Sequence, residues 1–211
     1  MKFFRFARAV VAPLCRLIFR VEIRGAENLP PEGAYILAPS HRSNLDTPFL
    51  ALVTPRRIRF MAKQELYRHG WSAKLFTALG GIPVERGSAT ARSALKAIQV
   101  ALEAGEPAAV FPEGTRRSGP VIEELFDGAA YLAVKLRIPL VPVGIGGSEA
   151  ILASGQKIPK LHKVAIVVGK PIMPPPDATT RRRADLRALT EQLREEIQRL
   201  FDEAQELAGQ R

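Results

Sequence analysis

The sequence predicts an α/β fold in which a mostly parallel sheet is covered by helices. Short apolar runs of strand length alternate along the chain with longer segments whose apolar residues recur at helical spacing, which is typical of parallel sheets. Polar loops follow several of these runs, and a parallel sheet presents its functional groups in the loops at the carboxyl ends of the strands. The length of 211 residues fits one domain with a sizeable core.

Residues 2–21 have the pattern of an amphipathic helix. Basic residues fall on one face (Lys2, Arg5, Arg8, Arg16 and Arg20) and apolar residues on the other (Phe3, Phe6, Val10, Leu14, Leu17, Ile18 and Val21). The longest stretch without charge, 9–15, is much shorter than the ~20 apolar residues that span a bilayer. The helix either docks on the core of its own domain or lies in a membrane interface. The basic stripe favours the interface.

The predicted core follows in order. Apolar runs indicate strands at 21–24, 34–38, 57–62, 107–111, 139–145 and 164–168, and helical periodicity indicates helices from about residue 48 and at 71–79, 88–104 and 128–137. A long helix is predicted from Thr180, with a stripe of Leu186, Leu189, Leu193, Ile197, Leu200 and Leu207. We expect three units: 1–29 with the amphipathic helix and a short strand, 30–176 as the core, and 177–211 as a helix packed on it.

The composition narrows the classes of partner. Lys and Arg number 31 against 21 Asp and Glu, and the net charge of +10 favours anionic partners such as nucleic acid, lipid headgroups or an acidic protein. Cys15 is the only cysteine, which excludes an intramolecular disulfide and fits a reducing compartment. With three scattered histidines the sequence predicts no metal site.

The segment 40–46 concentrates the chemistry. His41 and Asp46 stand five residues apart, so they would not share a face of a continuous helix and meet only if the chain turns between them. Asp46 or Thr47 can cap a helix that Pro48 opens, which predicts such a turn. A carboxylate on one imidazole nitrogen fixes the tautomer and leaves the other nitrogen free to accept a proton. The alternative is a surface loop with an incidental histidine.

Three further motifs follow in order: Gly80, Ile82 and Arg86 in the segment 80–86, Phe-Pro-Glu-Gly-Thr-Arg at 111–116, and Val-Pro-Val at 141–143. Taken alone, 113–116 also fits a surface turn with a local ion pair, and Arg86 next to Gly87 has the same alternative. The run 144–149 begins like a dinucleotide fingerprint, but Glu149 stands where the third glycine belongs, so it does not indicate a cofactor site.

This ordered set of motifs, with His41 and Asp46 matching a His-x4-Asp motif, resembles the glycerolipid acyltransferase family over residues 30–170. The resemblance is strongest to its bacterial 1-acylglycerol-3-phosphate acyltransferases. One departure is Asp127, at a position where relatives often carry a basic residue.

The resemblance implies that residues 30–176 form the catalytic core of an O-acyltransferase. His41 would be the base oriented by Asp46, and Arg86 and Arg116 would bind a phosphate. Gly114 and Thr115 would supply hydrogen-bond donors, and Glu113 would accept a bond from an acceptor hydroxyl or hold one of these two arginines. Lys63, at the end of its predicted strand, either faces the same pocket or is a solvated surface lysine.

The expected reaction moves a fatty acyl chain directly from a thioester to the hydroxyl of 1-acylglycerol-3-phosphate. The donor would be acyl-CoA or acyl carrier protein, and no cofactor is expected. We expect no acyl-enzyme, although Ser43 and Thr115 are candidate nucleophiles. The expected location is the cytoplasmic face of the cell membrane, held peripherally on anionic lipid. The alternatives are another acceptor, namely glycerol-3-phosphate or a glycolipid, and less favoured, nucleic-acid binding, because no aromatic stacking platform lies among the basic residues.

Overall fold

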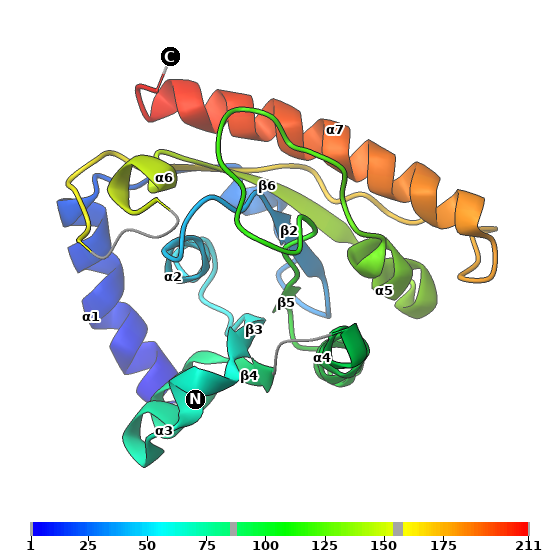
Figure 1. The fold of residues 1–211 in the computed structure, drawn as a ribbon, viewed down its shortest axis with the longest axis horizontal. Helices are drawn as coiled ribbons and strands as arrows, with labels where there is room; N and C mark the ends of the chain where they lie inside the picture. The colour runs from blue at the N-terminus through cyan, green and yellow to red at the C-terminus, as the bar shows by residue number, and fades with distance from the viewer. Residues whose placement is uncertain (1, 85–87, 154–157, 211) are drawn as a thin grey trace.

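A computed structural model describes residues 2–84, 88–153 and 158–210, and it has a seven-stranded sheet with helices on both faces (Figure 1). The strands are β1 (Glu22–Arg24), β2 (Ile36–Pro39), β3 (Arg59–Lys63), β4 (Gly81–Val84), β5 (Ala108–Ala109), β6 (Leu140–Gly146) and β7 (Ala165–Val168). Their order in the sheet is β1-β7-β6-β2-β5-β3-β4. All neighbouring strands are parallel except β6 and β7. The carboxyl ends of β2, β5, β3 and β4 therefore meet at one edge.

The helices are α1 (Lys2–Ile18), α2 (Asp46–Leu50), α3 (Gly70–Leu79), α4 (Ser88–Glu103), α5 (Gly128–Leu136), α6 (Ser148–Ile151) and α7 (Arg183–Leu207), with short 3₁₀ turns η1 (Ala26–Asn28) and η2 (Gln64–Tyr67). The mostly parallel α/β fold with a long C-terminal helix is thus confirmed. In the part of the chain that the structure describes, no helix combines the length and the hydropathy needed to cross a bilayer.

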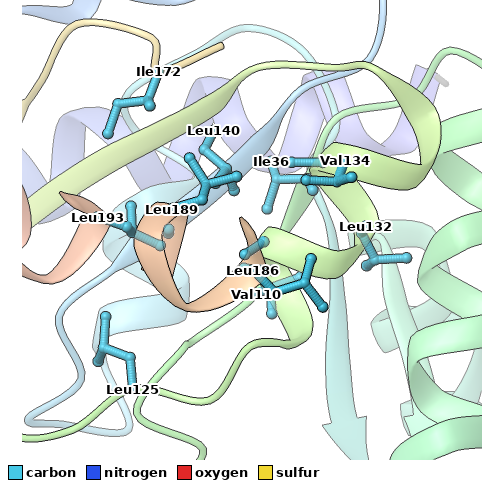
Figure 2. Packing of buried hydrophobic residues seen from close by; sticks show 14 of the residues in the cluster. Ile36, Val110, Leu125, Leu132, Val134, Leu140, Ile172, Leu186, Leu189 and Leu193 are labelled. Atoms are coloured by element: carbon cyan, nitrogen blue, oxygen red, sulfur yellow. The ribbon is translucent and has the colours of Figure 1, made fainter. Parts of the chain in front are cut away.

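The strands alternate their buried side chains between two layers, as the pleat requires. Ile36 and Ala38 of β2 belong to a cluster with α4, α5 and α7, whereas Leu37 points into a second cluster with α2 and α6. Figure 2 shows the first cluster, in which Leu186, Leu189 and Leu193 of α7 approach Leu140 of β6. A sheet buried on both faces explains the near-continuous apolar runs in the sequence.

Glycines in β6 allow α7 to lie unusually close to the sheet. A Cβ atom at Gly144 would lie 2.2 Å from the carbonyl carbon of Leu200, and one at Gly146 would lie 2.3 Å from that of Ala204. The glycine-rich run that begins like a dinucleotide fingerprint therefore serves helix packing.

The N-terminal helix α1 docks on the core through residues that the sequence did not place on the apolar face, and Val21 of the predicted face, just after the helix, also packs against the second cluster. Phe4 and Ala12 are buried, and Cys15 packs against the second cluster. Leu14, Leu17 and Ile18, which the sequence placed on the apolar face, are exposed. The helix thus docks on its own domain and still presents an apolar stripe outward.

Several predicted boundaries differ from those in the structure. Strand β5 has two residues instead of five, and α7 begins at Arg183, three residues after Thr180. The sequence analysis missed β4 and α6, which are four residues each. The proposed division at residues 29 and 176 stays a prediction; β1 lies in the same sheet as the core strands.

Gly146→Ala should destabilise the protein by about 1–3 kcal/mol, because the added methyl group meets the backbone of α7, which cannot move without shifting the helix. Urea unfolding followed by circular dichroism measures the loss. Gly70→Ala is the matched control: a Cβ there meets nothing within 4 Å, and the change should stay within about 0.5 kcal/mol. Equal stabilities for the two variants would contradict this explanation of the β6 glycines.

Candidate active site

His41 and Asp46 meet in the loop between β2 and α2. His41 Nδ1 lies 2.9 Å from Asp46 Oδ2, and the Asp46 side chain is fully buried. The same oxygen accepts the backbone N–H groups of Arg42 and Ser43, each at 2.7 Å. A carboxylate held by two amides accepts the Nδ1–H of the ring, which leaves Nε2 as the acceptor. Nε2 has no hydrogen-bond partner among the described residues.

The expected capping of α2 by Asp46 or Thr47 is wrong in detail. Asp46 is the first residue of the helix, the capping position is Leu45, and no side chain makes a capping hydrogen bond there. The Asp46 carboxylate instead accepts hydrogen bonds from residues 41–43 of the preceding loop. The turn that brings His41 to Asp46 is thus closed by Asp46 itself.

The His41 ring and backbone are both held by the loop that follows β5. The imidazole, 18% exposed, lies against the Phe111 ring with the centroids 4.0 Å apart. The His41 N–H donates to Glu113 Oε1 at 2.8 Å, and the Arg117 N–H donates to the His41 carbonyl at 2.9 Å. The 41–46 and 111–117 motifs therefore form one unit.

A buried ion pair joins these two loops. Arg42 and Glu113 are each 1% exposed, and one terminal nitrogen of the guanidinium lies 2.8 and 2.7 Å from the two carboxylate oxygens. The other donors of Arg42 reach the carbonyls of Gly119 and Val121 at 3.1 and 3.0 Å. Its guanidinium also lies 4.8 Å from the centroid of the Phe201 ring of α7. Breaking such a pair leaves an uncompensated buried charge.

Glu113 therefore holds an arginine, but its partner is Arg42 and not Arg86 or Arg116, which the sequence had suggested. Its carboxylate is too buried to face a substrate, because both oxygens are bound to Arg42. The remaining residues of the motif are more accessible. Gly114 and Thr115 are exposed, and Arg116 is half-buried without an ion pair among the described residues. Gly114 has φ +67°, a left-handed conformation that favours glycine.

The sequence also predicted two other basic residues in the site, Lys63 and Arg86. Lys63 ends β3 and is exposed, so both of its expected roles stay open. Arg86 follows β4 and lies outside the described residues.

The structure also places Ser43 and Asp127, and neither faces an open site. Ser43 is buried and its hydroxyl donates to the Leu152 carbonyl at 2.8 Å, which leaves it poorly placed as a nucleophile. Asp127, just before α5, accepts the Thr190 hydroxyl of α7 at 2.8 Å. Asp127, the residue that departs from the family pattern, therefore joins α5 to α7.

The described part of the chain has no group of three or more His, Cys, Asp or Glu that could hold a metal ion.

Sequence reasoning missed Arg42, Phe111 and Arg117 as parts of the site. Arg42 stands in a polar loop where an arginine is ordinarily solvated. The contacts that bury it come from residues 71 or more positions away. Phe111 was identified only as part of a motif, and its contact with His41 depends on the pairing of β2 with β5.

Comparisons with known proteins agree on one family. A family model described as Acyltransferase matches residues 20–146. A 1-acyl-sn-glycerol-3-phosphate acyltransferase from Bacillus subtilis is 28% identical over 97% of this chain and 100% of that protein. The human 1-acyl-sn-glycerol-3-phosphate acyltransferase alpha is 34% identical over 59% of this chain and 44% of that protein.

A solved structure shares the fold. The crystal structure of a 1-acyl-sn-glycerophosphate acyltransferase from Thermotoga maritima matches with a TM-score of 0.72, covering 93% of this chain and 80% of that chain at 24% identity.

Glu113→Gln should lower the free energy of unfolding by about 3 kcal/mol, because it leaves the Arg42 charge buried without its carboxylate. Urea unfolding checks this. The control is Glu123→Gln, which removes the half-exposed partner of Arg117 and should cost less than about 1 kcal/mol. If both variants lose the same small amount, the Arg42–Glu113 pair does not hold the loops together.

Proposed function

Since this chain belongs to the acyltransferase family, we propose that it transfers a fatty acyl group from a thioester to the free hydroxyl of 1-acylglycerol-3-phosphate and so forms phosphatidic acid. The observation that carries the proposal is the His41 imidazole at the carboxyl end of β2, oriented by a buried carboxylate and left with a free Nε2. The choice of acceptor is supported by the Bacillus subtilis relative, whose whole length this chain matches.

In the proposed mechanism His41 Nε2 takes the proton of the acceptor hydroxyl. The hydroxyl oxygen attacks the thioester carbonyl, and the tetrahedral adduct collapses with cleavage of the C–S bond. The imidazolium then gives the proton to the leaving thiolate, which returns His41 to its starting state. Asp46 stabilises the imidazolium and keeps its proton-bearing Nδ1 in place.

The exposed residues of the 113–116 motif would bind the phosphate of the acceptor and the oxyanion that forms during the reaction. Arg116 lacks an acidic partner among the described residues, and a guanidinium binds phosphate in a bidentate fork. We assign it, with Arg86, to the phosphate of the acceptor. Gly114 exposes the adjacent backbone, so that amides and the Thr115 hydroxyl can approach the oxyanion of the adduct.

The donor is a thioester of coenzyme A or of an acyl carrier protein, and the acyl group passes directly to the acceptor. The hydrogen bond from Ser43 to the Leu152 carbonyl supports direct transfer, because it occupies one of the two candidate nucleophiles. The transfer needs no cofactor in this scheme.

We also propose that the protein works peripherally at the cytoplasmic face of the membrane, where its acceptor resides. The outward stripe of Leu14, Leu17 and Ile18 on α1 supports this, because exposed apolar side chains beside Arg16 and Arg20 suit the headgroup boundary. Trp71 in α3, which contacts α1, is also exposed.

A product assay tests the function. Purified protein is given acyl-CoA or acyl carrier protein thioesters together with lysophosphatidate, glycerol-3-phosphate or a neutral lysolipid, and the products are identified by mass spectrometry. Phosphatidic acid should form with lysophosphatidate at a rate well above those of the other acceptors. Preferred acylation of glycerol-3-phosphate or of a neutral lipid would replace the proposed acceptor.

Arg116→Ala should lower kcat/KM for lysophosphatidate by the equivalent of about 2–5 kcal/mol, because a phosphate in the site loses its charge-assisted partner. A neutral lysolipid, if it is accepted at all, should be affected much less. Glu123→Gln is again the control, since its side chain is half-exposed and forms an ion pair with Arg117 and not with Arg116. An equal loss on charged and neutral acceptors would give Arg116 a structural role instead.

A further inference from the structure

The three most exposed large apolar side chains in the described part of the chain lie on two segments, the last turn of α1 and residues 158–163. Ile158, Leu161 and Leu17 are 81%, 79% and 78% exposed. Leu17 lies in the last turn of α1, and the other two lie in residues 158–163, which lead into β7. Exposed apolar groups of this kind mark surfaces that bind a partner or a membrane.

The 158–163 segment is held beside the end of α1. The Lys160 N–H donates to the Ile151 carbonyl of α6 at 2.8 Å, and the Val164 N–H donates to the Phe19 carbonyl at 3.0 Å. In agreement with the Val164–Phe19 hydrogen bond, Figure 1 shows the yellow segment that leads into β7 next to the C-terminal end of α1. The segment that carries Ile158 and Leu161 is therefore bonded to the end of α6 and lies beside the end of α1.

The same region touches the loop that carries His41. The Ser43 hydroxyl, between His41 and Asp46 in the chain, donates to the carbonyl of Leu152 directly after α6. Because Ile151 accepts the Lys160 N–H and Leu152 accepts the Ser43 hydroxyl, the 158–163 segment and the His41 loop are both bonded to the end of α6.

The two segments that carry these apolar groups are themselves basic in sequence. Residues 2–21 and 150–176 contain no Asp or Glu. Arg16, Arg20 and Lys160 are exposed, and none of them has an ion pair within the described ranges. Lys163 is paired with Glu22 at 2.7 Å. Exposed apolar side chains on segments that also carry the exposed cations Arg16, Arg20 and Lys160 match the acyl and phosphate layers of an anionic membrane surface.

We propose that Ile158 and Leu161 form a second membrane contact, which enters an anionic bilayer beside the last turns of α1. The two contacts hold the His41 loop at the lipid–water boundary, so that a single-chain acceptor reaches the imidazole while its acyl chain stays in the bilayer. This inference rests on the proposed function for its acceptor, whereas the membrane contact itself is measured without catalysis.

Tryptophan fluorescence locates the segment directly. Trp71 is the only tryptophan, so Trp71→Phe provides a silent background for Leu161→Trp. With vesicles of equal parts phosphatidylcholine and phosphatidylglycerol, the emission of L161W should shift to the blue and be quenched by lipids brominated on their acyl chains. The matched control is Val100→Trp in the same background, at an exposed position of α4, which should keep its aqueous emission.

A Leu161→Trp emission that stays aqueous while the protein is bound to vesicles would overturn the proposal. A blue shift without vesicles, together with a doubled mass in light scattering, would also overturn it, because the segment would then contact a second copy of the chain.

The paired substitution Ile158→Ser and Leu161→Ser measures what the contact contributes. Vesicle affinity should fall about tenfold or more through the loss of two inserted aliphatic side chains. Acylation of lysophosphatidate embedded in vesicles should fall in step, and acylation of a short-chain, monomeric lysophosphatidate should match wild type. Wild-type vesicle affinity in this variant contradicts the second contact. If the wild-type protein acylates neither form of the acceptor, the proposed function fails, and the fluorescence still decides where the segment lies.

Discussion

The buried pair of Arg42 and Glu113 is the interaction on which the candidate site depends. Two charges are removed from water, and this is tolerable only because the carboxylate receives two bonds from the guanidinium and the other guanidinium donors reach backbone carbonyls. The pair ties the loop after β2 to the loop after β5. His41 stands between them, with its N–H on Glu113 and its carbonyl on Arg117, so the backbone of the proposed base is held from both sides.

The fold supplies the frame for this pair. Parallel pairing of β2 with β5 brings the two loops to the same edge of the sheet. Helix α7 covers the first core cluster and places Phe201 under the Arg42 guanidinium, and it comes this close because Gly144 and Gly146 leave that part of β6 without side chains. The C-terminal helix, which the sequence predicted only to pack on the core, therefore reaches the site through the Phe201 ring, and its Gln198 side chain bonds the backbone of Pro120 and Ile122 in the loop that holds Arg42.

Much of this arrangement could be predicted from the sequence, because apolar periodicity and motif spacing are local signals. The meeting of His41 with Asp46 followed from the turn that their spacing requires. The burial of Arg42 did not, since an arginine in a polar loop has no local mark of a distant carboxylate. Two roles were possible for Glu113 until its partner, Arg42, was known. On α1, periodicity identified an apolar stripe with Leu17 but could not tell whether core or solvent lies beside it.

The central claim is that His41 and Asp46 act as one catalytic unit, and a double-mutant cycle on the acylation rate tests it most directly. His41→Ala should lower kcat by about 10²–10⁴, the usual contribution of a general base, while circular dichroism shows an intact fold. Asp46→Asn should lose a substantial part of that, and the double variant should be scarcely slower than His41→Ala alone. Fully multiplicative losses, or a His41→Ala protein that keeps most of its turnover, would contradict the account.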